Sequence, residues 1–417
     1  MAKAAATPDG LHFEPSTEIK IIKKQLDEFI EREVKPLEEE HDQYLGEDGM
    51  FNRADEDGKM TPEFQEIRNT IRRKSAEAGF LSMAMPEELG GEGMGDLAYS
   101  MVFEHLHNRN PDGFHRMIMS GDSEGMGGPV APQPDKLTDY QKEKWVKPSI
   151  RGELTNGMGL TEPDHGSDPT WMDSTAQKDG DEWVINGTKT YNTMAPIADF
   201  WVIHARTSGE DGDVRGISSF FVDRDNPGIE VGKYQRYMGD PLAHQAFVHL
   251  DDCRVPEENM IGAEGRGLLD QLKNFGGARV YITAHCVGRS QWMFDKCVEY
   301  AENRKTFGEP IGKNQFVQGM LADLRADIEQ TRWLYRHAAW RADNGEVPRW
   351  EISAAKLRGA QLWNKAADVA IQIHGGAGVM SSLPFEREYR EARMSRIVEG
   401  TDEIQKRTIA REFLDFN

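Results

Sequence analysis

The segment "QFVQGMLADLRADIEQTRWLYRHAAWRA" (residues 315–342) and the segment "ISAAKLRGAQLWNKAADVAIQIHGG" (residues 352–376) decide the fold class of this chain. Both are long, amphipathic and nearly free of helix-breaking residues. Their apolar side chains recur at the spacing of one helix face. The sequence therefore predicts that the chain is helical beyond about Leu268.

The residues before these helices have a different composition. Between residues 156 and 267, short β-branched and aromatic runs such as "EWVING", "DFWVIHA" and "ISSFFV" predict a small β domain. Asn186-Gly187 in the first run predicts a hairpin turn. From Thr17 to about Gly152 the chain is predicted to be mainly helical, with apolar residues at helical spacing at Ile19, Ile22, Leu26, Phe29 and Ile30. The predicted domains are residues 1–155, 156–267 and 268–417.

Two local patterns carry structural expectations of their own. The segment "EDGMFNRADEDGK" (residues 47–59) is predicted to be a solvated loop. His105 and His107 have no further metal-ligand type at close spacing, so they are predicted to be a surface pair rather than a metal site.

Composition excludes several functional classes. The chain has 417 residues, 50 basic and 71 acidic side chains and a formal charge of -21, which repels nucleic-acid phosphates and anionic membrane surfaces. Three cysteines without a Cys-x-x-Cys pair predict a reducing compartment and no structural metal. The first ten residues lack the pattern of a signal or transit peptide, and no apolar run approaches a membrane span. A cytoplasmic location is expected.

Four separated blocks resemble the acyl-CoA dehydrogenase flavoprotein family. They are "GLTEPDHGSD" (159–168), "INGTKTYNT" (185–193), "ENRKTFGEPIGKNQFVQGMLADL" (302–324), and "QIHGGAG" (372–378) with "RIVEGTDEIQKRTIARE" (396–412). Their order and approximate spacing also match, and the likeness covers essentially the whole chain. It implies an α+β multidomain protein that is mainly α, with an N-terminal helical domain, a middle β-barrel or sandwich domain and a C-terminal four-helix bundle.

The resemblance also implies a reaction of fatty acid and lipid metabolism, the α,β-dehydrogenation of an acyl-CoA thioester with FAD. This chemistry needs a base for the α-proton and a hydride acceptor for the β-hydrogen. Glu399 in "VEGT" matches the family's usual catalytic glutamate, and its apolar neighbours Ile397 and Val398 would favour a dry pocket that raises its pKa. Some relatives place the base on an earlier helix, but the matching position here is Ala278, which cannot take a proton.

Binding residues follow from the same resemblance. It implies FAD contacts at Thr161, Ser167, Tyr191, Thr193, Arg304, Thr306, Phe307, Gln315, Gln372, Gly375, Gly376, Thr401 and Glu403. It implies substrate contacts at Ser167, Arg279 and Gly400. In the family, the residues matching 304–307, 315 and 372–376 reach the FAD of a neighbouring subunit. The expected active protein is therefore a homo-oligomer, either a dimer or a homotetramer built as a dimer of dimers, with FAD held non-covalently between domains and subunits.

Departures from the family and alternative functions stay open at this point. His165 replaces a small residue, Tyr191 replaces a tryptophan, and residues 41–60 look like an insertion. Electron transfer to an electron-transfer flavoprotein is expected, because the chain offers no other redox centre. An acyl-CoA oxidase commonly has an additional C-terminal helical domain, and a monooxygenase or desulfinase on this fold usually lacks the glutamate. A non-catalytic binding protein is the alternative from another class, and the pattern does not identify the acyl chain.

Overall fold

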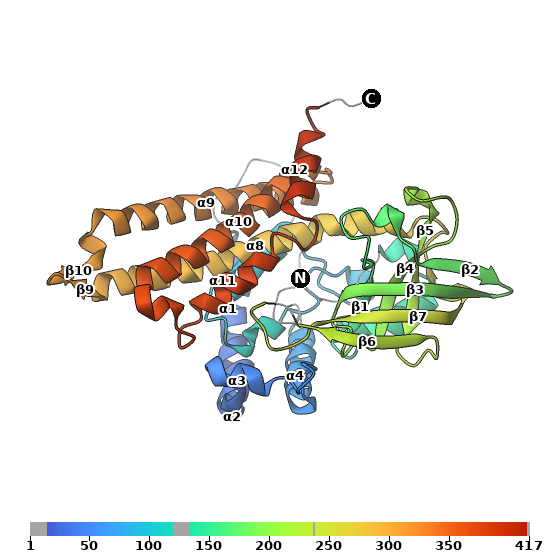
Figure 1. Cartoon of the computed structure of the whole chain (residues 1–417), viewed down its shortest axis with the longest axis horizontal. Helices are drawn as coiled ribbons and strands as arrows, with labels where there is room; N and C mark the ends of the chain where they lie inside the picture. Colours follow the sequence, from blue (N-terminus) through green and yellow to red (C-terminus); the bar gives the residue numbers. More distant parts are fainter. Residues whose placement is uncertain (1–14, 120–132, 237, 415–417) are drawn as a thin grey trace. The chain divides into compact units, whose positions relative to one another are not determined.

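The computed structural model describes residues 15–119, 133–236 and 238–414. The first ten residues, on which the expected cytoplasmic location partly rests, lie outside this description. The chain divides into two compact units (Figure 1). Unit 1 comprises Met1–Asp48, Met94–Arg116 and Gly276–Asn417, and unit 2 comprises Gly49–Gly93 and Met117–Phe275.

Unit 1 is built from long helices. Its elements are α1 (Thr17–Phe29), a π-helical turn (Ile30–Val34), α2 (Lys35–Glu40), α5 (Asp96–His107), α8 (Gly267–Asn303), β9 (Lys305–Thr306), β10 (Glu309–Pro310), α9 (Gln315–Asp343), α10 (Arg349–His374), α11 (Phe385–Met394) and α12 (Asp402–Ala410). Helix α8 starts in unit 2 and continues into unit 1. Helix α10 packs against α9, α11 and α12. The helical prediction for the last part of the chain is confirmed.

The two segments that decide the fold become α9 and α10. Helix α9 starts where the Asn314 side chain accepts a hydrogen bond from the Phe316 backbone N–H at 2.9 Å. Helix α10 ends at Gly375, whose φ of +60° is a conformation that glycine adopts without steric cost. Tyr300 near the end of α8 packs against His374, with ring centroids 4.3 Å apart. The ends of α8 and α10 therefore lie together, beside the start of α9.

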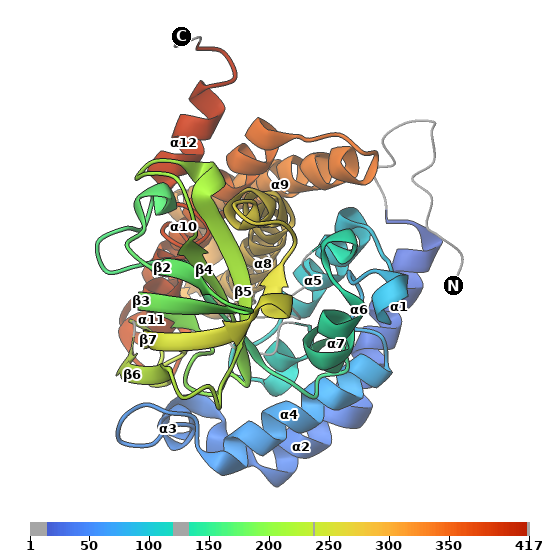
Figure 2. The ribbon, with the colours of Figure 1, turned by 90° about the vertical axis from the view of Figure 1, so that its right-hand side faces the viewer.

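Unit 2 contains an eight-stranded mixed sheet among its described residues, with strands β2 to β7 labelled in Figure 2. The strands are β1 (Asn156–Gly159), β2 (Thr175–Asp179), β3 (Glu182–Thr193), β4 (Phe200–Arg206), β5 (Ile217–Asp223), β6 (Ile229–Gln235), β7 (Gln245–Pro256) and β8 (Met260–Ile261). The path of the sheet is β6-β7-β3-β2-β4-β5-β8, and β1 pairs with β4 in parallel. The helices of this part of the chain are α3 (Gly46–Asn52), α4 (Pro62–Glu77), α6 (Asp139–Gln141) and α7 (Lys147–Ile150).

Strand β4 is buried on both faces. Trp201, Ile203 and Ala205 join the core formed by β3, β5 and β7, whereas Phe200 and Val202 pack against Trp145 and the residues around α7. Side chains alternate between the two faces of a strand, so one continuous apolar run serves both cores. The predicted β domain between two helical regions is confirmed.

The predicted Asn186-Gly187 hairpin turn is wrong. Strand β3 runs through this position, and its pairing with β7 shifts register between Ile185 and Gly187. Gly187 has φ +150°, and a Cβ there would lie 2.1 Å from Ser174 Oγ. The extra residue of this β-bulge lies in β7, where Asp252 has φ +46°, and Gly187 allows β3 to pass close to Ser174. The hairpin turn lies instead at Gly180-Asp181, between β2 and β3.

The prediction of a solvated loop at residues 47–59 is only partly correct, because Asp55, Glu56 and Asp57 are exposed in a turn but the rest of the segment is structured. The segment contains most of α3, and Ala54 forms a β-bridge with Met60. Met60 is buried, and the Gly58 carbonyl accepts a hydrogen bond from Ala243 N–H at 2.7 Å. The charged composition concealed these contacts because most of them are made by the backbone.

The predicted surface pair His105 and His107 is only half correct. His105 is partly exposed and lies 2.8 Å from Asp27, whereas His107 is fully buried against His285, with ring centroids 4.3 Å apart. Nearly the whole circumference of α5 is buried, so its pattern shows no solvent face.

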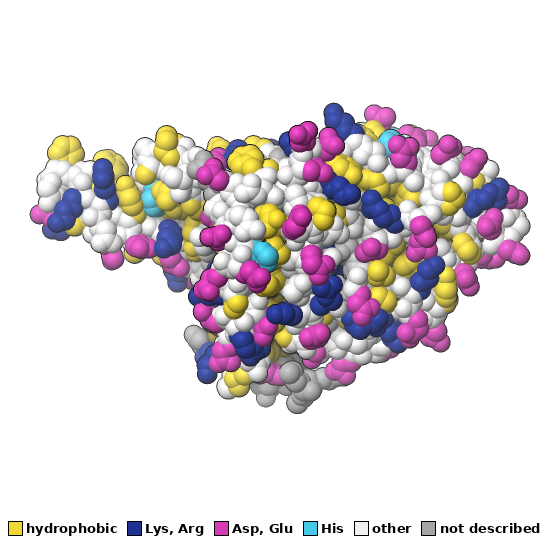
Figure 3. All heavy atoms as spheres, turned by 90° about the horizontal axis from the view of Figure 1, so that it is seen from below, with side chains coloured by type: hydrophobic (Ala, Val, Ile, Leu, Met, Phe, Trp, Pro, Cys, Tyr) yellow, Lys and Arg dark blue, Asp and Glu magenta, His cyan; other side chains and the backbone are white. Residues whose placement is uncertain are grey.

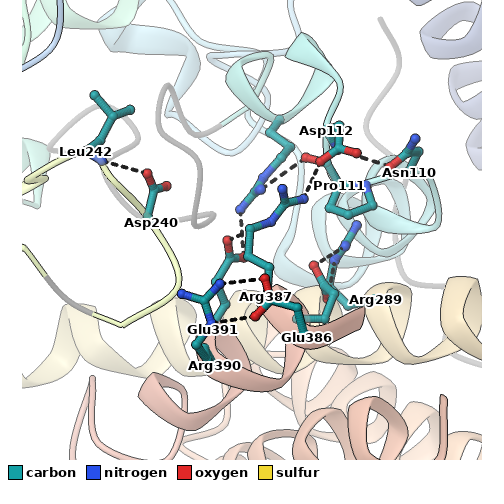
Figure 4. A network of polar contacts seen from close by, with 12 residues as sticks. Asn110, Pro111, Asp112, Asp240, Leu242, Arg289, Glu386, Arg387, Arg390 and Glu391 are labelled. Carbon is teal, nitrogen blue, oxygen red and sulfur yellow. Dashed lines mark hydrogen bonds and ion pairs between the residues drawn. The ribbon is translucent and has the colours of Figure 1, made fainter. Parts of the chain in front are cut away.

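A buried polar network connects helix α11 to the preceding part of unit 1 (Figure 4). Arg387 pairs with Asp112, and its Nε lies 3.4 Å from Glu391. Arg116 lies 3.3 Å from the other oxygen of Glu391. The charges of this network are paired, as burial requires. Within the described residues, no helix has both the length and the apolar character needed to cross a bilayer. Acidic and basic side chains are interspersed over the face drawn in Figure 3.

The buried histidines of unit 1 predict a loss of stability in mild acid. Burial lowers the pKa values of His107, His115 and His285 well below the ordinary value. They stay neutral in the folded chain but take up protons in the unfolded chain near about pH 6.5. Above that pH these histidines do not reduce the free energy of unfolding. Below it, each histidine lowers the free energy of unfolding by up to about 1.4 kcal/mol per pH unit.

Urea unfolding between about pH 7.5 and about pH 5.5 measures this slope. A His285→Gln variant carries one titrating group fewer, so its stability should fall less steeply over the same range. A free energy of unfolding that stays constant across this range would contradict the assignment of neutral, buried histidines.

Candidate active site

Glu399 lies in a tight turn between α11 and α12. Its φ is +53°, and the next residue, Gly400, has φ +93°. Two successive left-handed residues reverse the chain after α11, and only the second is a glycine. A Cβ at Gly400 would lie 2.8 Å from Gln405 Nε2 and 3.3 Å from an Arg279 guanidinium nitrogen, so the close approach also requires glycine.

Side chains from three helices hold this turn. Arg279 of α8 donates from Nε to the Glu399 carbonyl at 2.9 Å. Lys356 of α10 donates from Nζ to the Gly400 carbonyl at 2.7 Å. Gln405 of α12 donates from Nε2 to both carbonyls, at 3.1 and 2.9 Å. We call Glu399, Gly400 and these three side chains the base turn.

The Glu399 carboxylate is held away from water. Its Oε2 is closed to solvent and accepts no hydrogen bond within the described parts of the chain. Burial raises the pKa of Glu399, against the opposing charges of Arg279 and Lys356. Ile397, which was expected to help keep the pocket dry, is 55% exposed. Val398, the other predicted neighbour, is partly buried.

Thr401 and Glu403 lie at the start of α12, next to the base turn. The Thr401 hydroxyl accepts a hydrogen bond from Ile404 N–H at 3.3 Å and caps the helix, as the sequence predicts. Glu403 is exposed in the first turn. The backbone N–H groups of a helix start favour anionic groups such as phosphates.

A second set of predicted residues lies where α8 and α10 end and α9 begins. We call Arg304, Thr306, Phe307, Gln315, Gln372, Gly375 and Gly376 the distal end. Every member is exposed. Arg304 makes no side-chain hydrogen bond or ion pair with the residues described. A guanidinium, two side-chain amides and a hydroxyl form a donor set that suits a diphosphate.

The two sets do not meet within one chain. Along α8 a rise of 1.5 Å per residue places Arg304 about 37 Å from Arg279, and along α10 it places Gln372 about 24 Å from Lys356. The two sets are therefore well separated within one chain.

The third set of predicted residues belongs to unit 2. Thr190 N–H donates to the Thr161 carbonyl at 2.9 Å, which brings the 159–168 segment beside strand β3. Tyr191 is 66% exposed and has φ +54°, at a register shift between β3 and β7. Ser167 is exposed and Thr193 is partly exposed. All four side chains are thus carried by one loop and one strand.

A buried ion pair that the sequence interpretation missed supports this third set. Lys189 Nζ lies 2.7 Å from Glu162 Oε1, and both side chains are buried. Glu162 also accepts hydrogen bonds from the N–H groups of Asp173 and Ser174. Burial opposes the ionisation of Glu162, but Lys189 and these donors hold the pKa of Glu162 below its usual value. Lys189 lies on the same face of β3 as the buried Trp183 and Ile185. A lysine at a position where the strand pattern is apolar could have indicated this ion pair from the sequence.

His165, which stands where the family commonly has a small residue, contacts residues of unit 2. Its Nε2 lies 3.5 Å from Asp173, and its backbone exchanges hydrogen bonds with Glu162 at 3.1 and 3.2 Å. The histidine is therefore part of the tight turn that carries Ser167.

The sequence matches three family models along almost its entire length. They are described as the N-terminal, middle and C-terminal domains of acyl-CoA dehydrogenase, and they match residues 16–153, 157–253 and 265–414.

Individual proteins show the same likeness. The chain is 36% identical to the mitochondrial short-chain specific acyl-CoA dehydrogenase of Rattus norvegicus, over 82% of each chain. It is 32% identical to the caffeyl-CoA reductase-Etf complex subunit CarC of Acetobacterium woodii, over 95% of this chain and 98% of that protein. The solved structure of the FAD complex of PigA superimposes with a TM-score of 0.84 at 26% identity, covering 96% of this chain and 99% of that one.

The Glu162–Lys189 pair generates a stability prediction. Lys189→Met leaves a buried, unpaired carboxylate and should cost about 3–5 kcal/mol of unfolding free energy. The double variant Glu162→Gln with Lys189→Met removes both charges and should recover part of this loss. Lys178→Met is the control, because Lys178 pairs with Glu257 on the surface of the same sheet, where such pairs contribute about 0–1 kcal/mol. Urea unfolding measures all three variants. Equal losses for Lys189→Met and Lys178→Met would refute the structural role of the pair.

Proposed function

Because this chain belongs to the acyl-CoA dehydrogenase family, we propose that it converts an acyl-CoA thioester to the trans-2-enoyl-CoA with FAD as cofactor. Members of the family are oxidoreductases that act on CH–CH bonds. The observation that carries the proposal is the Glu399 carboxylate, which is held on a left-handed turn with one oxygen closed to water and unpaired among the described residues. A buried, unsatisfied carboxylate is costly to keep in a structure that does not use it.

Glu399 acts as the base in this proposal. Its carboxylate takes the α-proton, the electron pair of that C–H bond forms the new C=C bond, and the β-hydrogen leaves with its electron pair as a hydride. FAD, when bound, supplies the hydride acceptor. The raised pKa of Glu399 brings the base closer to the weak acidity of the α-proton, which favours the transfer near neutral pH.

Three groups of residues are proposed to hold FAD and substrate. The start of α12, with Thr401 and Glu403, suits the diphosphate. Thr161, Ser167, Tyr191 and Thr193 of unit 2 offer hydroxyls and an aromatic ring to the flavin. Gly400 and Arg279 lie at the base turn, where the thioester must bind if Glu399 is to reach its α-carbon. The relative PigA is an FAD complex by its description, which supports this cofactor.

A second copy of the chain is proposed to complete the site. The distal end carries exposed donors but lies about 24 Å from the base turn along α10 and about 37 Å from it along α8. Phe307 and Phe316 at this end are exposed large apolar side chains, and Val379 and Met380 lie just beyond α10. Apolar surface of this kind is usually covered in an oligomer. A homodimer, or a homotetramer built from two dimers, would bury these apolar side chains and would bring the distal end of one copy to the FAD of another.

The same residues can serve the reverse reaction. The relative CarC is described as part of a caffeyl-CoA reductase complex, which favours reduction of an enoyl thioester as a second candidate function. In that direction the neutral acid form of Glu399 donates the α-proton. Burial raises the pKa of Glu399, which favours this form more than in an exposed glutamate.

A Glu399→Gln variant tests the base. It should keep bound FAD but lose at least about 100-fold in the rate of flavin bleaching after anaerobic mixing with acyl-CoA thioesters, because general-base catalysis is typically worth 10²–10⁴. Glu412→Gln is the matched control, since Glu412 is exposed beyond α12. Normal bleaching of Glu399→Gln would reject Glu399 as the base, and a purified wild-type chain without FAD would reject the proposed function itself.

The electron acceptor is tested on the reduced enzyme. We propose an electron-transfer flavoprotein, because CarC is described as a subunit of a complex with Etf. Stopped-flow mixing of substrate-reduced enzyme with that carrier should reoxidise the flavin faster than mixing with dissolved oxygen. Rapid reoxidation by oxygen alone would instead identify an acyl-CoA oxidase.

A further inference from the structure

Lys356 is a cation in a position where the helix pattern calls for an apolar side chain. It lies on the buried face of α10 together with Ile352, Ala355, Gly359 and Ala360, at helical spacing. Its side chain is fully buried. A buried ammonium carries a large desolvation cost, which its hydrogen bonds and charged neighbours must offset.

The ammonium of Lys356 is directed at the backbone of the base turn. Nζ lies 2.7 Å from the Gly400 carbonyl, which Gln405 Nε2 also approaches at 2.9 Å. The turn that receives these bonds holds Glu399 at φ +53°, a conformation that costs a non-glycine residue free energy. The hydrogen bonds to the Gly400 carbonyl, which follows Glu399, therefore oppose relaxation of the turn.

Groups from three elements face Lys356. Cys286 and Arg279 belong to α8, Glu399 belongs to the turn, and Asp402 is the first residue of α12. Burial lowers the pKa of Lys356 to about 8, with the carboxylates of Asp402 and Glu399 acting in the opposite direction. Asp402 is already paired with Arg396 at 2.8 Å. Of these two acidic neighbours, Glu399 is therefore the one whose carboxylate forms no ion pair with a described residue.

We propose that Lys356 is a positioning residue of this site, which clamps the Gly400 carbonyl and places a positive charge beside the Glu399 carboxylate. The proposal rests on the proposed function of Glu399 as base. The clamp sets where the carboxylate lies. The charge favours its ionised form, which is the form that accepts a proton.

The two roles predict two separate effects of removing the ammonium. Without the hydrogen bond to Gly400, the backbone of the turn should open more often, so its amide hydrogens should exchange faster. Without the charge, the ionised form of Glu399 loses a favourable neighbour and its pKa rises further. The acid limb of the pH profile for flavin reduction should then move to higher pH by about one unit.

The experiment compares three variants of the FAD-loaded chain. Lys356→Met removes the charge and the donor at similar length, and Lys356→Arg keeps both. Lys365→Met is the matched control on the same helix, because Lys365 is 44% exposed and pairs with Asp327. Hydrogen exchange with mass spectrometry follows peptides covering residues 396–410, and flavin absorbance checks that FAD is retained. Anaerobic stopped-flow with butyryl-CoA and longer acyl-CoA thioesters gives the pH profile of flavin reduction.

Lys356→Met should accelerate exchange in residues 396–410 at least about threefold and displace the acid limb upward, whereas Lys365→Met and Lys356→Arg should stay close to wild type on both measures. Unchanged exchange or an unmoved acid limb in Lys356→Met overturns the proposal. A wild-type chain that binds FAD but bleaches with none of the thioesters would refute the proposed function instead, and the exchange measurement would still report on the clamp.

Discussion

The candidate site depends on one constraint, the left-handed backbone at Glu399 and Gly400. A non-glycine residue in this region costs about 1–3 kcal/mol and persists only where its surroundings enforce it. Here the enforcement comes from α8, α10 and α12, each of which contributes one side chain that donates to a carbonyl of the turn. The carboxylate, its raised pKa and the start of α12 all follow from that geometry. The turn is therefore a junction of three helices as well as the place of the base.

Long helices connect this junction to the distal end. Helix α8 carries Arg279 about a third of the way along and leads to Arg304 just beyond its end, and α10 carries Lys356 in its first third and ends at Gly375. An α-helix has a fixed rise per residue, so α8 and α10 fix the distance between the base turn and the distal end. In the proposed site, the distal end of one copy therefore reaches the cofactor beside the base turn of another.

The sequence predicted the elements better than the partners. Helices α9 and α10 were readable because amphipathic spacing is a local property, and Glu399 was found through a short motif. Lys356 and Lys189 were not recognised, although each lies on a buried face, because the pattern does not say which carbonyl or carboxylate meets the ammonium. The Asn186-Gly187 pair fits a turn or a continuous strand equally well, and the choice is made by the cross-strand partners in β7. His107 failed for a similar reason, since the helices that cover α5 come from distant sequence.

Backbone strain provides a criterion that is independent of the motif. Among the residues described, the non-glycine positions with positive φ are Tyr191, Met194, Asp252, Phe307 and Glu399. Three of these are predicted site residues, and a fourth directly follows Thr193. Phe307 occupies a two-residue hairpin turn with Gly308, where asparagine or aspartate would be the favoured choice. A strained aromatic that is fully exposed gains nothing from its own chain. In the proposed site a bound group or another copy would contact this ring, which is the role that the distal end has there.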